Sequence, residues 1–281
     1  MILYILCHNS TYGYFEDYIL SLENILKYQF SITKILYNQP SELECIINDN
    51  DRYLFFQVIP EILKTTLMYP HCAVVNTEQL TRPEWLSSIR TYLESGIAVY
   101  DYDLYQSRML GHPQHQYLPY PITLTEYESL SQLLKQTPKI YDIAFCGALS
   151  PRREHILKTL RDLGVSIINV HGHGLVRDKL IAQARVLLNI HYNDDYQIFE
   201  HLRCDRWIIT GMLVISERSV SDVDFNLKKM VIRCDYNQLG SKVMETLHNY
   251  PEKYLKHLKK LETNGEKAIQ VISNQYHNFL L

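Results

Sequence analysis

The chain has 281 residues, of which 46% are hydrophobic and 21% are charged, and its formal net charge at pH 7 is −3. This composition is that of an ordinary globular protein, with enough residues for a large core or for two α/β domains of roughly 140 residues each. The slight negative charge argues against a dedicated nucleic-acid-binding protein, which would carry a basic stripe.

Targeting signals and membrane segments are not expected. The apolar residues 2–7 are too few for a signal peptide and lack a basic leader, so they predict a first strand. No run approaches the ~18 apolar residues of a membrane span. The six cysteines form no C-x-x-C pair, and three of them lie in apolar runs where they fit the role of small core residues. We therefore expect a reduced, cytoplasmic protein, or one of the host cytoplasm if the source is viral.

The first half of the chain alternates short apolar strands with amphipathic helices. We expect strands at residues 2–7, 31–37, 53–59, 71–76 and 97–100, and helices after the first strand, from Pro60, and at 85–94. This alternation predicts a parallel sheet with helices on both faces. The loops that follow the strands would carry polar residues to one rim of the sheet. These residues are His8, Asn9, Tyr12, Glu78 and Asp101.

A segment with two prolines, LPYPI at residues 118–122, separates two series of elements. Proline is excluded from helix interiors and central strands, so this segment is the expected entry to a linker. We expect an N-terminal domain over residues 1–122, a linker helix over 123–138 and a C-terminal domain over 139–250. A last helix would span 251–281, with an interruption at Gly265.

The second series begins with a strand–helix–strand unit that contains a candidate phosphate cradle. Gly147 ends the strand, and Arg152 and Arg153 lie in the first turn of a helix that a Ser-Pro pair opens. A helix N-terminus attracts anions, and two guanidinium groups strengthen this attraction. The same arginines could instead pair with Glu154 or Asp162 on the surface. Only one glycine of the G-x-G-x-x-G fingerprint is present.

The next strand, at residues 166–170, is followed by the run HGHG at 171–174. The glycines let the backbone approach a ligand closely, so His171 is a candidate binding residue. A zinc site would require more ligands than these two histidines.

Residues 184–217 form a second strand–helix–strand unit with polar residues at both strand ends. A strand at 186–190 ends in a polar cluster that begins with His191, and a helix over 197–210 presents Glu200 and Arg203. Gly211 ends this helix, and a strand at 212–215 leads to Ser216 and Glu217. A carboxylate can accept both hydroxyls of a ribose, and an arginine can bind a phosphate with two donors. The spacing of Glu200 and Arg203 is also that of a surface ion pair.

This unit resembles the nucleotide-sugar domain of GT-B glycosyltransferases, in the group with the pattern "LNiH…fE..R…G..viSE". The matching residues are Leu188, Asn189, Ile190, His191, Phe199, Glu200, Arg203, Gly211, Val214, Ser216 and Glu217. The resemblance covers about a third of the chain closely and the remainder by architecture. The paired-glutamate motif of retaining GT-B enzymes is not present in its usual form, which leaves open whether the sugar is transferred with inversion or retention.

The resemblance implies a GT-B fold, in which two Rossmann-like domains face each other across a cleft and the last helix returns to the first domain. It implies a nucleotide-diphosphate sugar as donor, a glycan or another hydroxyl compound as acceptor, and no metal or other cofactor. Glu200 would hold the donor ribose, while Arg152, Arg153 and Arg203 would neutralise the diphosphate. Gly147, His171, His191, Ser216 and Glu217 would complete the donor site. An inverting enzyme would need a general base, for which His8, Glu78 and Asp101 are candidates.

Two other readings remain open. Asp101-Tyr102-Asp103 has the D-x-D pattern by which GT-A glycosyltransferases hold a divalent metal, and the pattern recurs at residues 222–224. A catalytically inactive module that binds sugar nucleotides or glycans is the second alternative. The chain has no G-x-S-x-G elbow, Walker loop or H-E-x-x-H motif, which excludes three large enzyme classes.

Overall fold

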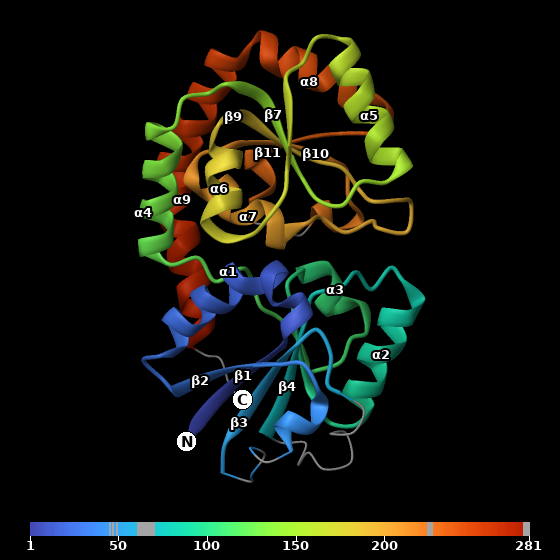
Figure 1. The fold of residues 1–281 in the computed structure, drawn as a ribbon, viewed down its shortest axis with the longest axis vertical. Helices are drawn as coiled ribbons and strands as arrows, with labels where there is room; N and C mark the ends of the chain where they lie inside the picture. Colours follow the sequence, from blue (N-terminus) through green and yellow to red (C-terminus); the bar gives the residue numbers. More distant parts are fainter. Residues whose placement is uncertain (45, 47, 49, 61–70, 224–226, 278–281) are drawn as a thin grey trace. The chain divides into compact units, whose positions relative to one another are not determined.

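The computed structural model describes residues 1–281 except 45, 47, 49, 61–70, 224–226 and 278–281 (Figure 1). The chain folds into two compact units, one formed by Met1–Pro121 with Ile272–Leu281 and the other by Ile122–Val271. Each unit contains a sheet in which all strands are parallel. The predicted α/β class is therefore confirmed.

The first unit contains a six-stranded sheet in the order β2-β1-β3-β4-β5-β6. Its strands are β1 (Ile2–His8), β2 (Ser31–Tyr37), β3 (Arg52–Phe56), β4 (Cys72–Asn76), β5 (Ala98–Asp101) and β6 (His115–Tyr117), and its helices are α1 (Asn9–Leu26), α2 (Pro83–Glu94) and α3 (Leu104–Met109). The central strands are continuous apolar runs because both faces of a parallel sheet are covered. The sequence does not predict β6 or α3, because both are short and polar. The helix expected from Pro60 lies outside the described residues.

A tyrosine from far along the chain completes the core of the first unit. Tyr276, near the end of helix α9 (Tyr250–His277), is fully buried, and its hydroxyl donates to the carbonyl of Pro119. Its hydroxyl also lies 3.4 Å from that of Tyr18, and its carbonyl accepts a 2.9 Å bond from Gln29. Buried hydroxyls of this kind require partners, so Tyr276 belongs structurally to the first unit.

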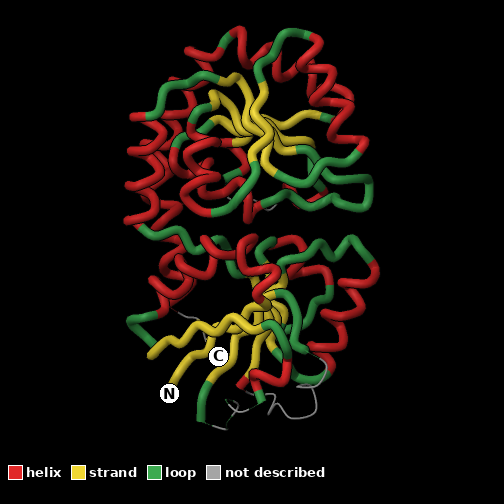
Figure 2. The backbone as a smooth tube through the Cα atoms, in the orientation of Figure 1, coloured by secondary structure: helices red, strands yellow, loops and turns green. Residues whose placement is uncertain are grey.

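The second unit contains a five-stranded sheet in the order β11-β10-β9-β7-β8. Its strands are β7 (Tyr141–Cys146), β8 (Ile167–Val170), β9 (Ala184–Asn189), β10 (Leu213–Glu217) and β11 (Val231–Cys234). Its helices are α4 (Leu124–Gln136), α5 (Pro151–Asp162), α6 (Gly174–Ala182), α7 (His201–Thr210), α8 (Leu239–His248) and the first part of α9. Helices lie on both sides of this sheet (Figure 2). Helix α4 packs against α6 and α7, and α5 packs against α8.

A buried ionic network joins the helices that pack around α4. Arg206 of α7 donates from Nε to Glu126 of α4 at 2.9 Å, and from Nη1 and Nη2 to the two carboxylate oxygens of Asp178 in α6, each at 3.0 Å. A planar guanidinium matches a carboxylate in this bidentate way. The network attaches α4 to the second unit.

Two helices differ from the sequence expectation. Helix α7 begins at His201, with Glu200 as its N-cap, so the expected start at residue 197 is wrong. Phe199 precedes the helix and is buried, and Trp207 within the helix is buried as well. Helix α7 ends at Gly211 as predicted, with φ at +108°. Helix α9 continues through Gly265, where the sequence predicts an interruption.

Candidate functional site

Three adjacent strands of the second sheet end beside one another and carry most of the candidate donor residues. β10, β9 and β7 are neighbours, and they lead respectively to Glu217, His191 and Gly147. Ligands of open α/β sheets bind beyond the carboxyl ends of the strands. This edge of the second sheet is therefore the candidate site.

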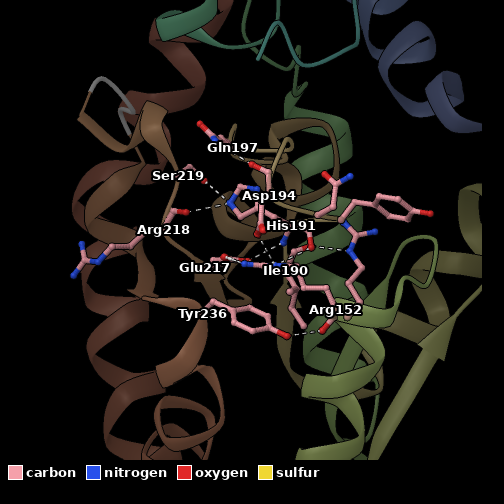
Figure 3. Close-up of polar contacts among 12 residues, drawn as sticks. Arg152, Ile190, His191, Asp194, Gln197, Glu217, Arg218, Ser219 and Tyr236 are labelled. Atoms are coloured by element: carbon pink, nitrogen blue, oxygen red, sulfur yellow. Dashed lines mark hydrogen bonds and ion pairs between the residues drawn. The ribbon is translucent and has the colours of Figure 1, made fainter. Parts of the chain in front are cut away.

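Arg152 forms a two-pronged ion pair with Glu217 (Figure 3). Its Nη1 donates to Glu217 Oε2 at 2.6 Å, its Nη2 donates to Oε1, and its Nε lies 3.2 Å from Asp194. The guanidinium also stacks 3.7 Å above the ring centre of Tyr236. Two carboxylates thus compensate the charge of Arg152, and its geometry is fixed by β10 and by the loop after β9.

His191 is held between the same glutamate and the loop after β10. Its backbone N–H donates to Glu217 Oε2 at 3.1 Å, and its Nε2 lies 3.1 Å from the carbonyl of Arg218 and 3.1 Å from Ser219 Oγ. Nδ1 is buried and has no partner among the described residues. Burial lowers the pKa of His191 below its ordinary value, so the imidazole is neutral at pH 7 and Nδ1 is available as an acceptor.

A hollow of about 410 Å³ opens between these side chains. Its lining includes Arg152, His191, Asp194, Tyr196, Gln197, Glu217 and Ser219. Polar groups that converge on one concave space are typical of a small-molecule site. The sequence alone does not single out Tyr196, Gln197, Ser219 or the neighbouring Tyr236. All four lie in the segments that follow β9, β10 and β11, and this position after a strand could have identified them.

A second cluster lies at the end of β7, where two guanidinium groups contact the same glycine. A Cβ atom on Gly147 would lie 3.0 Å from Nη2 of Arg203 and 3.3 Å from Nη1 of Arg153. Arg203 donates from Nη1 to Asn189 at 3.2 Å, and its Nη2 lies 3.7 Å from Glu200. The glycine leaves the space that both cations occupy.

Arg153 is almost completely enclosed, and protein carbonyls fix its orientation. Its Nε donates to the carbonyl of Ile190 at 2.8 Å, and its Nη1 donates to that of Ala148 at 2.7 Å. Burial, and then the proximity of Arg203, lower the pKa of Arg153 to about 10. Arg153 is therefore charged at pH 7, and its guanidinium lies close to that of Arg203. Glu200, with its side chain 21% exposed, is the acid beside them.

The remaining donor-site candidates are placed less centrally. Ser216 is fully buried, accepts a bond from Asn189 at 3.0 Å and donates to the carbonyl of Glu217 at 2.7 Å. It therefore supports the strand ends. His171 is exposed after β8, the edge strand, and among the described residues it forms no hydrogen bond or ion pair with the two clusters.

Among the candidate bases of the first unit, Asp101 is enclosed. It is fully buried and accepts bonds from Asn76 at 2.7 Å and Gln106 at 2.9 Å, while His115 Nε2 lies 3.3 Å away. Burial raises its pKa above the ordinary value. The expectation that Asp101 is presented on an open rim is wrong, because α3 and β6 supply groups that surround it.

His8 and Glu78 are more accessible. His8 caps α1 by accepting from the N–H of Ser10, and its Nε2 lies 3.1 Å from the carbonyl of Asn38. Glu78 accepts a 2.7 Å bond from Gln57 and pairs with Arg82 at 3.2 Å, and its side chain remains 21% exposed. His8 is the last residue of β1, and Glu78 follows β4, so both lie at the carboxyl ends of strands in the first sheet.

The structure gives no support to the D-x-D pattern at residues 101–103 as an open metal site. Asp103 is 1% exposed and caps α3 by accepting from the N–H of Gln106. Within the described part of the chain, no group of three or more histidine, cysteine, aspartate or glutamate side chains is arranged to hold a metal ion. Part of the second D-x-D, at residue 224, lies outside the described residues.

No helix among those described is long and apolar enough to cross a bilayer.

The fold is similar to that of a known glycosyltransferase. Phage T4 BGT, solved in complex with UDP and Mn2+, superimposes with a TM-score of 0.56, and the alignment covers 98% of each chain at 14% sequence identity. At this identity the similarity concerns the fold, which is glycosyltransferase-like. No family model matches the sequence.

Relatives at the sequence level come from Acanthamoeba polyphaga mimivirus. The chain is 34% identical to uncharacterized protein L138 over 275 residues and 36% identical to L137 over 251 residues. It spans about a third of the length of these two proteins, 31% and 34% respectively. It is 32% identical to uncharacterized protein L140 over 255 residues, which covers 88% of this chain and 81% of L140. The chain therefore belongs to the same protein family as mimivirus L140, with a glycosyltransferase-like fold.

Proposed function

We propose that this protein transfers a sugar from a nucleoside diphosphate donor to a hydroxyl group of a glycan or another small acceptor. The observation that carries the proposal is the pair of guanidinium groups, from Arg153 and Arg203, that meet at Gly147 beside Glu200. Two adjacent cations at the end of a parallel strand favour a ligand with two negative groups close together, such as a diphosphate. That phage T4 BGT was solved with UDP supports the same class of donor.

Each side chain of this cluster has a distinct proposed role. Arg153 and Arg203 would bind the diphosphate and stabilise the negative charge that develops on it as the sugar leaves. Glu200, 3.7 Å from Arg203, would accept the two hydroxyls of the donor ribose. Arg152 is bound on both sides by carboxylates, so its proposed role is to position Glu217 and the loop that bears His191.

The proposed chemistry requires no resident metal, because the arginines supply the positive charge. If transfer occurs with inversion, the acceptor hydroxyl loses its proton to a general base. Glu78 is our first candidate for that base, since its carboxylate is partly exposed whereas Asp101 is enclosed. His8 is the second candidate.

The test is a binding screen followed by an activity assay. UDP, GDP, ADP and dTDP are titrated into the full chain by calorimetry, and we expect one of them to bind. Binding to the folded state also raises the melting temperature, which provides a second measurement. Arg203→Gln should weaken that binding about tenfold or more, as loss of a charge-assisted bond predicts. Arg185→Gln is the matched control, because Arg185 lies near the start of β9, at the opposite end of the strand from the site, and pairs with Asp142.

Activity separates the alternatives. Release of nucleoside diphosphate from the matching nucleotide sugar, unchanged in EDTA, would support the proposed enzyme. Strict dependence on Mn2+ would favour a metal-assisted reaction. Binding without any turnover would support an inactive binding module. If none of the four nucleotides binds, or if Arg203→Gln and Arg185→Gln bind equally well, the proposal is wrong.

A further inference from the structure

A second hollow lies at the other edge of the second sheet. It has a volume of about 200 Å³ and is bordered by Leu213, at the start of β10, and Val231, at the start of β11. Glu217 ends β10, so the candidate donor site lies about 13 Å further along that strand. The two hollows are therefore separate, and a ligand of the second one is independent of the proposed function.

The charged lining of this hollow is entirely basic. Among the described residues that line it none is acidic, and the basic ones are Lys229, Lys253, Lys256, Lys260 and His257. Three of the lysines follow one another at the i, i+3 and i+7 positions of α9, which places them on one face of the helix. A concentration of positive charge around a recess attracts anions.

The lysines are not all compensated by protein acids. Lys253 donates to Glu245 at 2.6 Å, and Lys260 donates to the carbonyl of Lys229 at 2.7 Å, which anchors it at the rim. Lys256 is exposed and forms no ion pair with any acid in the described part of the chain. At least one full positive charge therefore remains for a ligand.

His257 provides the feature that defines the ligand. It is 4% exposed and lines the hollow, and its Nε2 has no hydrogen-bond partner among the described residues. The ring bonds to the carbonyl of Ile208, and since Nε2 is unpaired this bond is donated by Nδ1. Burial, and then the charge of Lys260, lower the pKa of His257 to about 4. The imidazole is thus neutral at pH 7, and Nε2 is a buried acceptor in a hollow that the lysines also line.

Few ligands satisfy both kinds of group. A buried acceptor left without a donor is unfavourable, so the ligand has to bring an O–H or N–H to Nε2 of His257. It also has to present negative oxygens to the lysine ammonium groups. Sulfate, acetate and the dianion of methyl phosphate offer oxygens but no hydrogen to donate, and a metal cation is repelled by the lysines. Inorganic phosphate carries both charged oxygens and a P–O–H group at neutral pH.

We propose that the hollow formed by η5 (Lys228–Met230), the start of β11 and helix α9 is a binding site for hydrogen phosphate. The P–O–H of the ligand donates to Nε2 of His257, and its charged oxygens accept hydrogen bonds from the lysines at the rim, Lys256 among them.

The experiment is a comparison of oxyanions by calorimetry on the full chain at pH 7.5, in a buffer without phosphate. We expect inorganic phosphate to bind about tenfold more tightly than sulfate, because only phosphate donates to Nε2. Methyl phosphate, which is mostly a dianion at this pH and has no hydroxyl group to donate, should behave like sulfate. Equal affinity for the three anions, or no binding of phosphate at millimolar concentration, would overturn the proposal.

Variants locate the binding. Lys256→Gln should weaken phosphate binding by about threefold, whereas Lys259→Gln removes the same charge from the same helix outside the hollow and should leave it unchanged. Phosphate that binds instead to Arg153 and Arg203 would respond to neither variant, and that result would also count against the proposal.

His257→Asn tests the acceptor itself. The asparagine amide can reproduce the donation to the Ile208 carbonyl while it removes the Nε2 atom, so the preference for phosphate over sulfate should disappear. Circular dichroism checks that the variant is folded. If it is not, the selectivity of the unmodified protein and the matched lysine variants decide the question without it.

Discussion

Arg152 and Glu217 face each other at the carboxyl edge of the second sheet, with Nη1 of the arginine 2.6 Å from Oε2 of the glutamate. The same carboxylate oxygen accepts the backbone N–H of His191, so one glutamate links α5, β10 and the loop after β9. The neighbouring residue on α5, Arg153, lies against a second arginine, Arg203, with Glu200 as the nearby acid. Two consecutive arginines thus have different electrostatic surroundings.

Glu217→Gln should lower the stability of the protein. The substitution removes the negative charge that compensates Arg152 and leaves a partly buried guanidinium without its main partner, which we expect to reduce the free energy of unfolding by about 2 kcal/mol. Urea denaturation measures this change. Glu245→Gln is the control, since Glu245 forms only surface ion pairs with Lys242 and Lys253. Similar losses in the two variants would contradict the structural role of Glu217.

Gly147→Ala should weaken nucleotide binding about tenfold or more. The added methyl group would lie 3.0 Å from Nη2 and 3.2 Å from Cζ of Arg203, so the guanidinium has to move away from its position beside Arg153. The φ angle of +149° adds backbone strain. Gly164→Ala separates the two effects, because Gly164 has φ at +83° and open space around it. Calorimetry should show reduced affinity in Gly147→Ala alone.

Arg206→Met should destabilise the second unit. It removes the partner of two buried carboxylates, on Glu126 and Asp178, and an uncompensated buried charge costs about 3 kcal/mol. Asp178 retains a 2.8 Å contact with Arg177, so the loss should be larger in the double variant Arg177→Met/Arg206→Met. Thermal denaturation followed by circular dichroism tests this order, and an unchanged melting temperature in Arg206→Met would contradict it.

Stability should fall as the pH drops from about 6.5 to about 4, in part because of His257. Its pKa is about 4 in the folded protein and 6.5 ordinarily, so in this range the unfolded chain binds a proton that the folded chain does not. The difference between the two pKa values of His257 corresponds to about 3 kcal/mol of folding stability. This contribution is fully present above pH 6.5 and is lost as the pH falls to about 4. The other ionisable groups that line the same hollow are the lysines Lys229, Lys253, Lys256 and Lys260.

The measurement is denaturant unfolding at several pH values in buffers without phosphate. His257→Asn should flatten the curve between pH 6.5 and 4 relative to the unmodified protein. His191, whose pKa is also lowered by burial, contributes a slope of the same sign in both proteins. Parallel curves for the two proteins would show that His257 is not the group responsible.

The sequence predicts the order of strands and helices well because parallel strands are continuous apolar runs and the helices between them are amphipathic. It does not predict β6, which consists of the polar residues His115–Tyr117 and forms because β5 offers an edge to pair with. The start of α7 is also mispredicted. Ile198 and Phe199 lie at helical spacing from Leu202, but both are buried in the loop that precedes the helix.

The candidate site shows the same limit at the level of single residues. Strand ends identify Gly147, His191 and Glu217, since the edge of a parallel sheet is fixed by topology. Arg152 and Arg153 are separated by a rotation of about 100° around the axis of α5, and this rotation decides which of them pairs with Glu217. The local sequence pattern does not predict it. The burial of Asp101 likewise depends on α3 and β6, whose positions are set by tertiary contacts.

The position of Tyr276 has a consequence for biosynthesis. The first unit leaves the ribosome before the second, yet its interior lacks one aromatic side chain until residue 276 has been translated. The core of the first unit beside Tyr18 is therefore incomplete while all five strands of the second sheet are being synthesised. A fragment that stops at residue 121 would keep that space permanently and should be a target for chaperones and proteases.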